Sequence, residues 1–285
     1  MIEGDTFQRF LLEELHIRGE WVRLSDSYQE ATKDLEYPEN LRSLLGQAAA
    51  ASVLLTGTLK FDGRLSIHAR GEGVVNLLMA EATNRRTYRG IVDWQGEVDP
   101  EASLVELLGN AQLAITIDPD KGNRYQGVVP LERENLADCL AHYFELSEQL
   151  DTFLMLEANE NGCFGLMLQK LPDYKDIEDQ DAWNRIAQFA KTLKIDEFMA
   201  ADNETLLLRL FHEEKVLSFD KEPVKFECSC SRERTLSSIE TLGQDEALEI
   251  LENTATIAVD CQFCRKHYEF DRADIVELFR LGSSH

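Results

Sequence analysis

The feature that most constrains this chain of 285 residues is the placement of its cysteines, because four of the six fall in the last 58 residues. They form a Cys-x-Cys pair and a Cys-x-x-Cys pair, separated by thirty residues. Two close pairs of thiolates suit a tetrahedral zinc site, with each sulfur about 2.3 Å from the metal. A unit this small has little core of its own, so a bound zinc ion would stabilise it directly. The predicted ligands of one zinc ion are Cys228, Cys230, Cys261 and Cys264, in a C-terminal zinc-binding domain of residues 228–285.

A histidine ligand and a disulfide framework are weaker alternatives to this four-cysteine zinc site. His267 could serve as a ligand, although four cysteines already fill the site. A static disulfide framework is typical of secreted proteins, but residues 1–5 carry acid where a secretory signal would carry base. The most apolar stretch, 48–55, is far too short to span a membrane. We therefore expect a cytoplasmic protein that does not enter membranes and whose thiols are kept reduced.

Zinc binding and disulfide formation compete for the same sulfur atoms. Around a tetrahedral ion, neighbouring sulfurs lie about 3.8 Å apart, whereas a disulfide requires about 2.05 Å. A disulfide would therefore remove ligands and expel the metal. If zinc contributes on the order of 10 kcal/mol to so small a fold, its loss should unfold the C-terminal domain. The predicted site is a switch as well as a structural support.

The charge of the chain limits its partners. It has 53 acidic and 29 basic side chains and a net charge of −24, and the excess of acid extends along the whole sequence. Affinity for nucleic acid depends on Lys and Arg side chains that neutralise phosphates. We therefore expect no nucleic-acid partner. A high net charge favours solubility, also in a protein that sometimes exposes apolar surface.

Residues 1–172 are predicted to form an α+β domain. Helical spacing of apolar residues predicts a helix over 5–15, and an Ala-rich run predicts a buried helix over 44–59. After a turn at 61–64, alternating apolar residues and further turns predict an antiparallel meander. The strands of the meander are 65–69, 74–82 and 88–94. Further strands are predicted at 113–117, 153–157 and 164–168, with a hairpin turn at 161–162 and a helix over 136–144.

Residues 173–227 are predicted to be a metastable helical connector. A charged stretch at 173–181 precedes an amphipathic helix, and a second apolar segment follows at 206–211. The segment is too apolar for a free linker, so we expect it to dock across the sheet of the N-terminal domain in the reduced state. Alternatively, the helix belongs to the N-terminal core and never moves. The residues predicted to act as a latch are Trp183, Ile186, Ala190 and Leu193.

No catalytic motif accompanies these features. The sequence has no HExxH, GxSxG or Walker pattern, and the glycines at 71 and 73 lack the third glycine of a dinucleotide fingerprint. We therefore predict that the chain is not an enzyme. Cys139 lies on the apolar face of a predicted helix and is expected in the core. For Cys163 the sequence does not separate a packed thiol from an exposed one.

The cysteine pairs and their surroundings resemble the bacterial heat-shock protein 33 family of redox-regulated chaperones. The strongest segments are PVKFECSCSRER (223–234), CQFC (261–264) and YEFDRADIVELF (268–279). Weaker ones are 8–24, 44–67 and 165–172. The resemblance implies a zinc-bound, inactive, reduced state. It also implies that oxidants such as peroxide form the disulfides Cys228–Cys230 and Cys261–Cys264, release zinc, unfold the C-terminal domain and destabilise the connector. The implied active protein holds unfolding client proteins without ATP, often as a homodimer.

Two rival functions use the same cysteines. A thiol-disulfide oxidoreductase would use Cys261 and Cys264 catalytically, normally at a helix N-terminus and without a second pair. A structural zinc-ribbon module that binds nucleic acid would need a basic surface, which no section of the chain supplies.

Overall fold

The computed structural model describes residues 4–33, 35–59, 62–172, 179 and 181–282. The chain divides into two compact units, Met1–Glu227 and Cys228–His285. The α+β prediction is confirmed, and the antiparallel strands of the first unit form two sheets. Most of the charged stretch at 173–181, and residue 61 of the predicted turn, lie outside the described residues.

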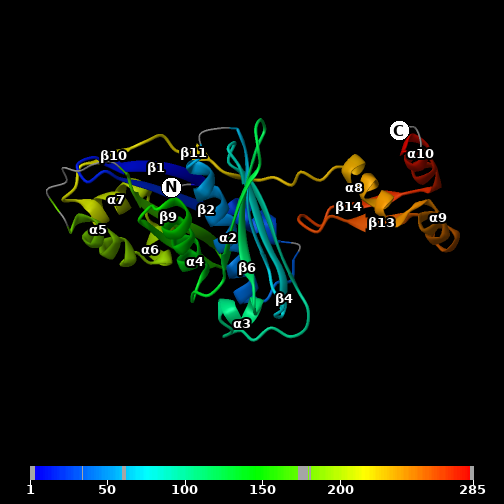
Figure 1. Cartoon of the computed structure of the whole chain (residues 1–285), viewed down its shortest axis with the longest axis horizontal. Coiled ribbons are helices and arrows are strands. Elements are labelled where there is room, and N and C mark those ends of the chain that lie inside the picture. Colours follow the sequence, from blue (N-terminus) through cyan, green and yellow to red (C-terminus); the bar gives the residue numbers. More distant parts are fainter. Residues whose placement is uncertain (1–3, 34, 60–61, 173–178, 180, 283–285) are drawn as a thin grey trace. The chain divides into compact units, whose positions relative to one another are not determined.

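Sheet A has the strand order β10-β1-β2-β9-β8, and β11 pairs with the remaining length of β1. Every pairing in it is antiparallel. Helices cover both of its faces (Figure 1). Its strands are β1 (Thr6–Leu12), β2 (Ile17–Leu24), β8 (Thr152–Asn159), β9 (Gly162–Lys170), β10 (Val216–Ser218) and β11 (Glu222–Pro223).

Sheet B has the strand order β12-β5-β4-β3-β6-β7. The predicted meander is confirmed as β3, β4 and β5, and only the short β12 runs parallel to its neighbour. Its strands are β3 (Gly63–Arg70), β4 (Val75–Thr83), β5 (Thr87–Trp94), β6 (Gln112–Pro119), β7 (Tyr125–Pro130) and β12 (Lys225–Phe226).

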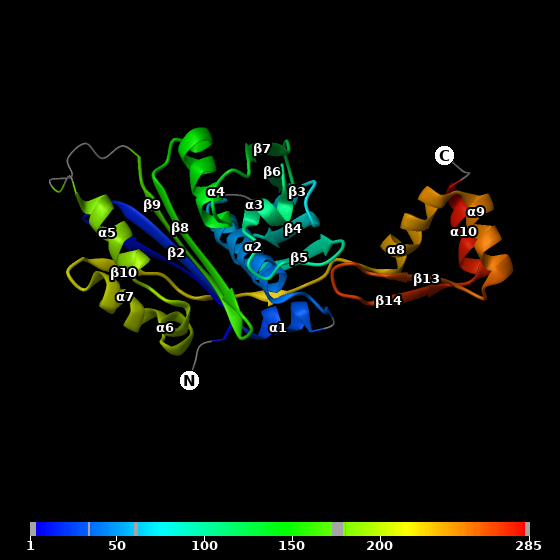
Figure 2. The same ribbon diagram turned by 90° about the horizontal axis from the view of Figure 1, so that it is seen from below.

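Helix α2 (Glu39–Gly57) lies between the two sheets (Figure 2). It is buried on most of its faces, as its run of alanines predicted, and its small side chains let both sheets approach closely. A Cβ atom at Gly46 would lie 2.8 Å from the Cβ atom of Ala158, so glycine is needed at this contact with β8.

The predicted helix over 5–15 is wrong, because residues 6–12 form strand β1. Phe7 packs toward α2, while Phe10 and Leu12 pack on the opposite face of sheet A. A strand that is buried on both faces has no strict alternation of apolar and polar residues. Its apolar spacing therefore imitated that of a helix.

The other helices of the first unit include most of those predicted. The 136–144 prediction is confirmed as α4, which continues into a π-helical turn, and the amphipathic pattern around Trp183 is confirmed as α5. The elements are α1 (Asp26–Thr32), α3 (Leu104–Leu108), α4 (Leu136–Tyr143), the π-helical turn Phe144–Glu148, α5 (Ala182–Lys191), α6 (Ile195–Ala200) and α7 (Asn203–Phe211). Within the described residues, no helix is long and apolar enough to cross a membrane.

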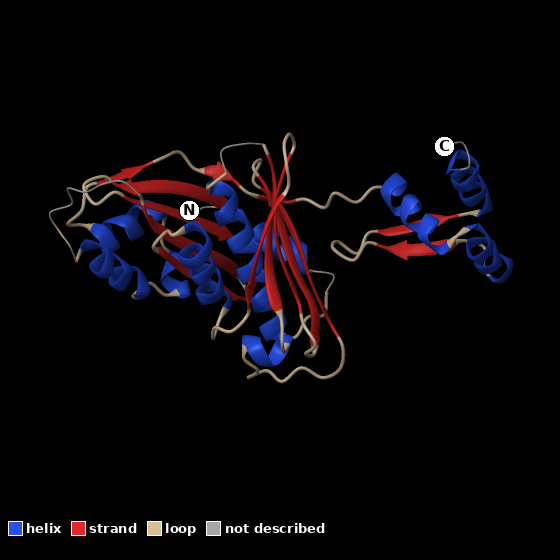
Figure 3. Ribbon diagram, viewed as in Figure 1, coloured by secondary structure: helices blue, strands red, loops and turns tan. Residues whose placement is uncertain are grey.

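The second unit consists of short helices and one antiparallel hairpin (Figure 3). Its buried core is small and centres on Ile239, Tyr268, Phe270 and Ile275. Its elements are α8 (Arg232–Ser238), a 3-10 turn (Ile239–Leu242), α9 (Gln244–Asn253), β13 (Ile257–Asp260), β14 (His267–Phe270) and α10 (Arg272–Gly282).

Candidate metal centre

Two loops of the second unit carry the four cysteines. Cys228 and Cys230 precede α8, whose first turn is capped by the Ser231 hydroxyl, which accepts a hydrogen bond from the Arg234 amide at 3.2 Å. Cys261 and Cys264 lie in the turn between β13 and β14. The Arg265 amide donates to the Cys261 carbonyl at 2.8 Å, and Arg265 has a left-handed backbone (φ 54°) that closes this turn.

The four Sγ atoms lie within 4.8 Å of one another. The Sγ atoms of Cys228 and Cys261 are 3.6 Å apart, and those of Cys230 and Cys264 are 3.5 Å apart. These distances are close to the 3.8 Å or so expected around a tetrahedral ion and far from the 2.05 Å or so of a disulfide. Among the residues that the structure describes, this is the one group of His, Cys, Asp and Glu arranged to hold a metal ion.

The electrostatics of the cluster favour a thiolate at Cys230. Burial raises the pKa of its thiol, but a hydrogen bond from the Tyr268 hydroxyl at 3.2 Å, together with the neighbouring cysteines, lowers that pKa to about 7. Burial raises the pKa of the Cys228 thiol. A thiolate is the form that binds metal and reacts with oxidants.

His267, at the start of β14, has its ring nitrogens directed at two carboxylates. Its Nδ1 lies 2.7 Å from an Asp260 carboxylate oxygen and its Nε2 lies 3.4 Å from Glu269. The hydrogen bonds to Asp260 and then Glu269 raise the pKa of its imidazole. Both ring nitrogens thus face carboxylates, and His267 is outside the group that could hold a metal ion.

The two remaining cysteines are packed in the first unit. The expectation that Cys139 is a core residue is confirmed, since it is 1% exposed on α4. Cys163, which the sequence left open, is fully buried at the start of β9. Burial raises the pKa of both thiols, which keeps them protonated and unreactive.

The predicted latch residues lie against sheet A. Ile186, Ala190 and Leu193 are buried in a cluster with Phe10 and Trp21, and Trp183 is partly buried at its edge. This contact matches the expected docking of the helix on the sheet. The structure does not test whether the contact opens, so the latch stays a prediction.

Polar contacts that hold α6 were missed by the sequence predictions. The buried Arg23 side chain of β2 donates to the Met199 carbonyl at 3.2 Å and to the Ala201 carbonyl at 2.6 Å, at the end of α6. Its guanidinium also lies over the ring of Phe198, which stacks on Phe164. An arginine within an apolar strand was the available signal, because a buried charge needs partners.

Comparison with known proteins gives the family. The family model described as Hsp33 protein matches residues 5–271. The chain belongs to the Hsp33 family. The 33 kDa chaperonin of Hahella chejuensis is 47% identical over 287 residues, covering 100% of each sequence. That of Ectopseudomonas mendocina is 46% identical over 281 residues, covering 97% of this chain and 95% of its own length.

A solved structure agrees with this assignment at the level of the fold. The 33 kDa chaperonin of Thermotoga maritima, titled a heat shock protein 33 homolog, superposes with a TM-score of 0.84 at 21% identity. The match covers 99% of this chain and 100% of that one. Membership of the Hsp33 family supports a chaperone function, and the relatives are named chaperonins rather than enzymes, in agreement with the sequence prediction.

Proposed function

We propose that this Hsp33-family chain is a redox-regulated, ATP-independent holding chaperone. In the reduced state Cys228, Cys230, Cys261 and Cys264 hold one zinc ion, and the chaperone is inactive. The observation that carries the proposal is the gathering of four thiols within 4.8 Å in a unit with a small core. A bound zinc ion would supply charge neutralisation and cross-linking that this core lacks.

Oxidation empties the site, because each disulfide removes two of the thiolates that hold the ion. Two thiolates give up two electrons to form one disulfide, and one hydrogen peroxide takes up these electrons and two protons from solvent to become two waters. Closure entropy favours the short loops of Cys228–Cys230 and Cys261–Cys264 over a link between the pairs. Peptide mapping of the oxidised protein should find these two links, and a dominant Cys230–Cys261 link would contradict this pairing.

Loss of the folded second unit then weakens the connector that precedes it. The connector covers one face of sheet A with apolar side chains of α5, α6 and α7. Released, these segments and the sheet expose apolar surface that unfolding client proteins can bind. We place this activity in the cytoplasm under oxidative and heat stress, with a homodimer in the oxidised state and no role for nucleic acid or membranes.

The rival oxidoreductase finds less support in the site. Cys261 and Cys264 lie in a hairpin turn and not at a helix N-terminus, where the helix dipole would activate a catalytic thiol. The acidic charge of the chain disfavours a zinc ribbon that binds nucleic acid.

The test compares two activities in the reduced and the peroxide-oxidised protein. We expect the oxidised form alone to suppress light scattering by a heat-unfolding client protein, and neither form to catalyse insulin reduction. One zinc per chain should accompany the reduced form, and Cys261→Ser with Cys264→Ser should lose it. Catalysed insulin reduction with zinc retained, or full zinc in the double variant, would overturn the proposal.

A further inference from the structure

The last residues before the cysteines join both sheets of the first unit. Strands β10 and β11 pair with β1 of sheet A, and β12 pairs with β5 of sheet B. Three backbone amides complete the attachment: Val224 donates to Asp5, Lys225 to Arg86 and Glu227 to Tyr88, at 2.9 to 3.0 Å. Since β11 and β12 have two residues each, their backbone pairing alone is weak.

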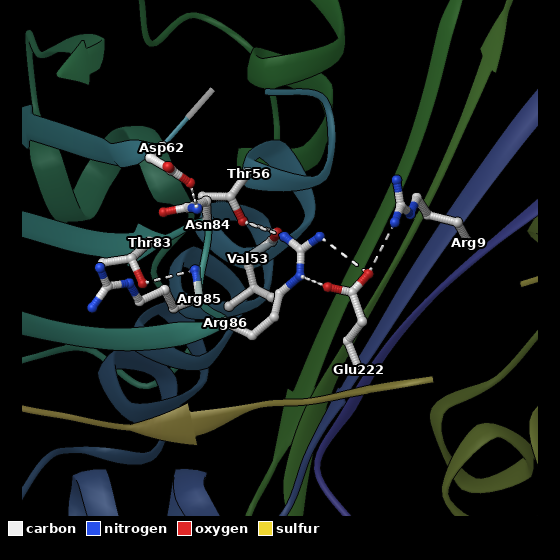
Figure 4. A network of polar contacts seen from close by, with 9 residues as sticks. All are labelled: Arg9, Val53, Thr56, Asp62, Thr83, Asn84, Arg85, Arg86 and Glu222. Carbon is white, nitrogen blue, oxygen red and sulfur yellow. Dashed lines mark hydrogen bonds and ion pairs between the residues drawn. The ribbon is translucent and has the colours of Figure 1, made fainter. Parts of the chain in front are cut away.

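A buried arginine holds this segment at its centre (Figure 4). Arg86 lies in the turn between β4 and β5 with a left-handed backbone (φ 59°), and it is 7% exposed. Its guanidinium lies 3.8 Å from the centre of the Phe7 ring and donates to the Thr56 hydroxyl at 2.9 Å. These two contacts, both outside the connector, help to fix the plane of the guanidinium.

The remaining donors of Arg86 point at the connector. They reach the two carboxylate oxygens of Glu222 at 2.9 and 3.4 Å, which is a bidentate pair. Arg9 of β1 donates to the same carboxylate at 3.1 Å, from a side chain that is half exposed. Glu222 thus bridges a buried and a surface arginine, and the carboxylate itself is 33% exposed, so salt can reach the ion pair.

Arg86 therefore contacts the segment at two points. Its guanidinium donates to the Glu222 carboxylate, and its carbonyl accepts a hydrogen bond from the Lys225 amide. We propose that the Arg86–Glu222 ion pair is a clasp that fastens residues 222–227 to the two sheets and sets how readily they detach. This regulatory role rests on the proposed function, whereas the clasp itself can be measured without it. The exposed ion pair of Arg64 with Asp118, at 3.0 Å, joins β3 and β6 in the same unit and serves as a control.

The test uses the full-length, reduced, zinc-loaded protein. Glu222→Gln keeps the shape of the side chain and removes its charge. We expect the amides of Val224, Lys225 and Glu227 to exchange hydrogen about tenfold faster, with zinc content unchanged. Asp118→Asn should leave this exchange unchanged. Raising the salt concentration should speed exchange in the wild type and not in Glu222→Gln, which a merely structural role would not produce.

A double variant and an activity assay complete the test. Arg86→Gln with Glu222→Gln should speed exchange by less than the product of the two single effects, because both substitutions remove the shared Arg86–Glu222 ion pair. Peroxide should activate Glu222→Gln as a client-holding protein faster than the wild type. Wild-type exchange in Glu222→Gln would overturn the clasp even if the wild type holds clients. Faster exchange in a chain that never holds clients would keep the clasp and reject the proposed function.

Discussion

Tyr268 is the residue that tunes the cysteine cluster most directly. Its hydroxyl donates to the Cys230 Sγ at 3.2 Å, and its ring is part of the small core. We predict that Tyr268→Phe lowers zinc affinity by about tenfold, because hydrogen bonds to metal ligands contribute roughly 10- to 100-fold. Competition with a chromophoric chelator measures this, and the retained ring keeps the core packed. Equal affinities would show that the hydrogen bond does not support the site.

Glu20 makes the folding stability of the first unit depend on pH. Its carboxyl is 2% exposed, and burial raises its pKa to about 7, against the opposing effects of Arg18, Arg86 and Arg9. Between pH 4.5 and 7 the folded chain holds a proton that the unfolded chain has released. The stabilisation of the folded chain by the protonated Glu20 carboxyl is therefore complete below pH 4.5, and it is lost as pH rises to about 7.

A neutral side chain at position 20 should remove this dependence. We predict that the unfolding free energy of Glu20→Gln, relative to wild type, grows by roughly 3 kcal/mol from about pH 4.5 to about pH 8, at about 1.36 kcal/mol per pKa unit. Denaturant unfolding of the two proteins across this range measures the difference. Parallel stability curves would mean that the carboxyl of Glu20 titrates normally in the folded chain.

Single residues were predictable where the sequence places partners close together. The cysteines occur as two short pairs, so their gathering at one site could be inferred from spacing. Arg86 and Glu222 are 136 positions apart, and Arg23 is separated from Ala201 by 178. Contacts across such separations depend on the topology of two sheets, which spacing along the chain does not reveal.

Among the elements, helix α5 carries the latch hypothesis. Ile186 is fully buried on its inner face, and Leu193 just beyond it is 1% exposed. We predict that aspartate at both positions detaches the connector and gives client-holding activity in the reduced, zinc-bound protein, because each charge would lose its water on docking. Light scattering of a heat-unfolding client measures this activity.

Leu208 of α7 provides the matched control, since its side chain is 69% exposed. Leu208→Asp adds one such charge to the connector without disturbing its contact with sheet A, so it should not activate the protein. If the variant with aspartate at Ile186 and Leu193 loses stability and gains no client-holding activity, α5 belongs to a permanent core and the latch hypothesis is wrong.

Elements were predictable where the residues form a clear local pattern. The amphipathic pattern of α5 and the alternation in β3 identified both correctly. In sheet A, which is buried on both faces, β8 and β9 were found beside the hairpin turn at 161–162, whereas β1 was misread as a helix and β2 was missed. The short β10, β11 and β12 carry no pattern of their own and exist through pairing with β1 and β5.

At the scale of the whole molecule, the chain joins a large first unit to a small second unit whose fold we attribute to zinc. A stable fold beside a metal-dependent one makes a switch, because removal of the metal changes the free energy of one unit only. Four cysteines lie in the second unit, and the first has only the two buried thiols of Cys139 and Cys163 among its described residues.

The most direct test of the proposed switch follows zinc release and client holding in one sample during oxidation by peroxide. A chromophoric chelator reports released zinc, and aliquots are assayed for suppression of client aggregation. We predict that one zinc per chain is released with two disulfides formed, and that holding activity rises with zinc release or after it. Full holding activity while zinc stays bound, or complete release with no activity at any time, would contradict the switch.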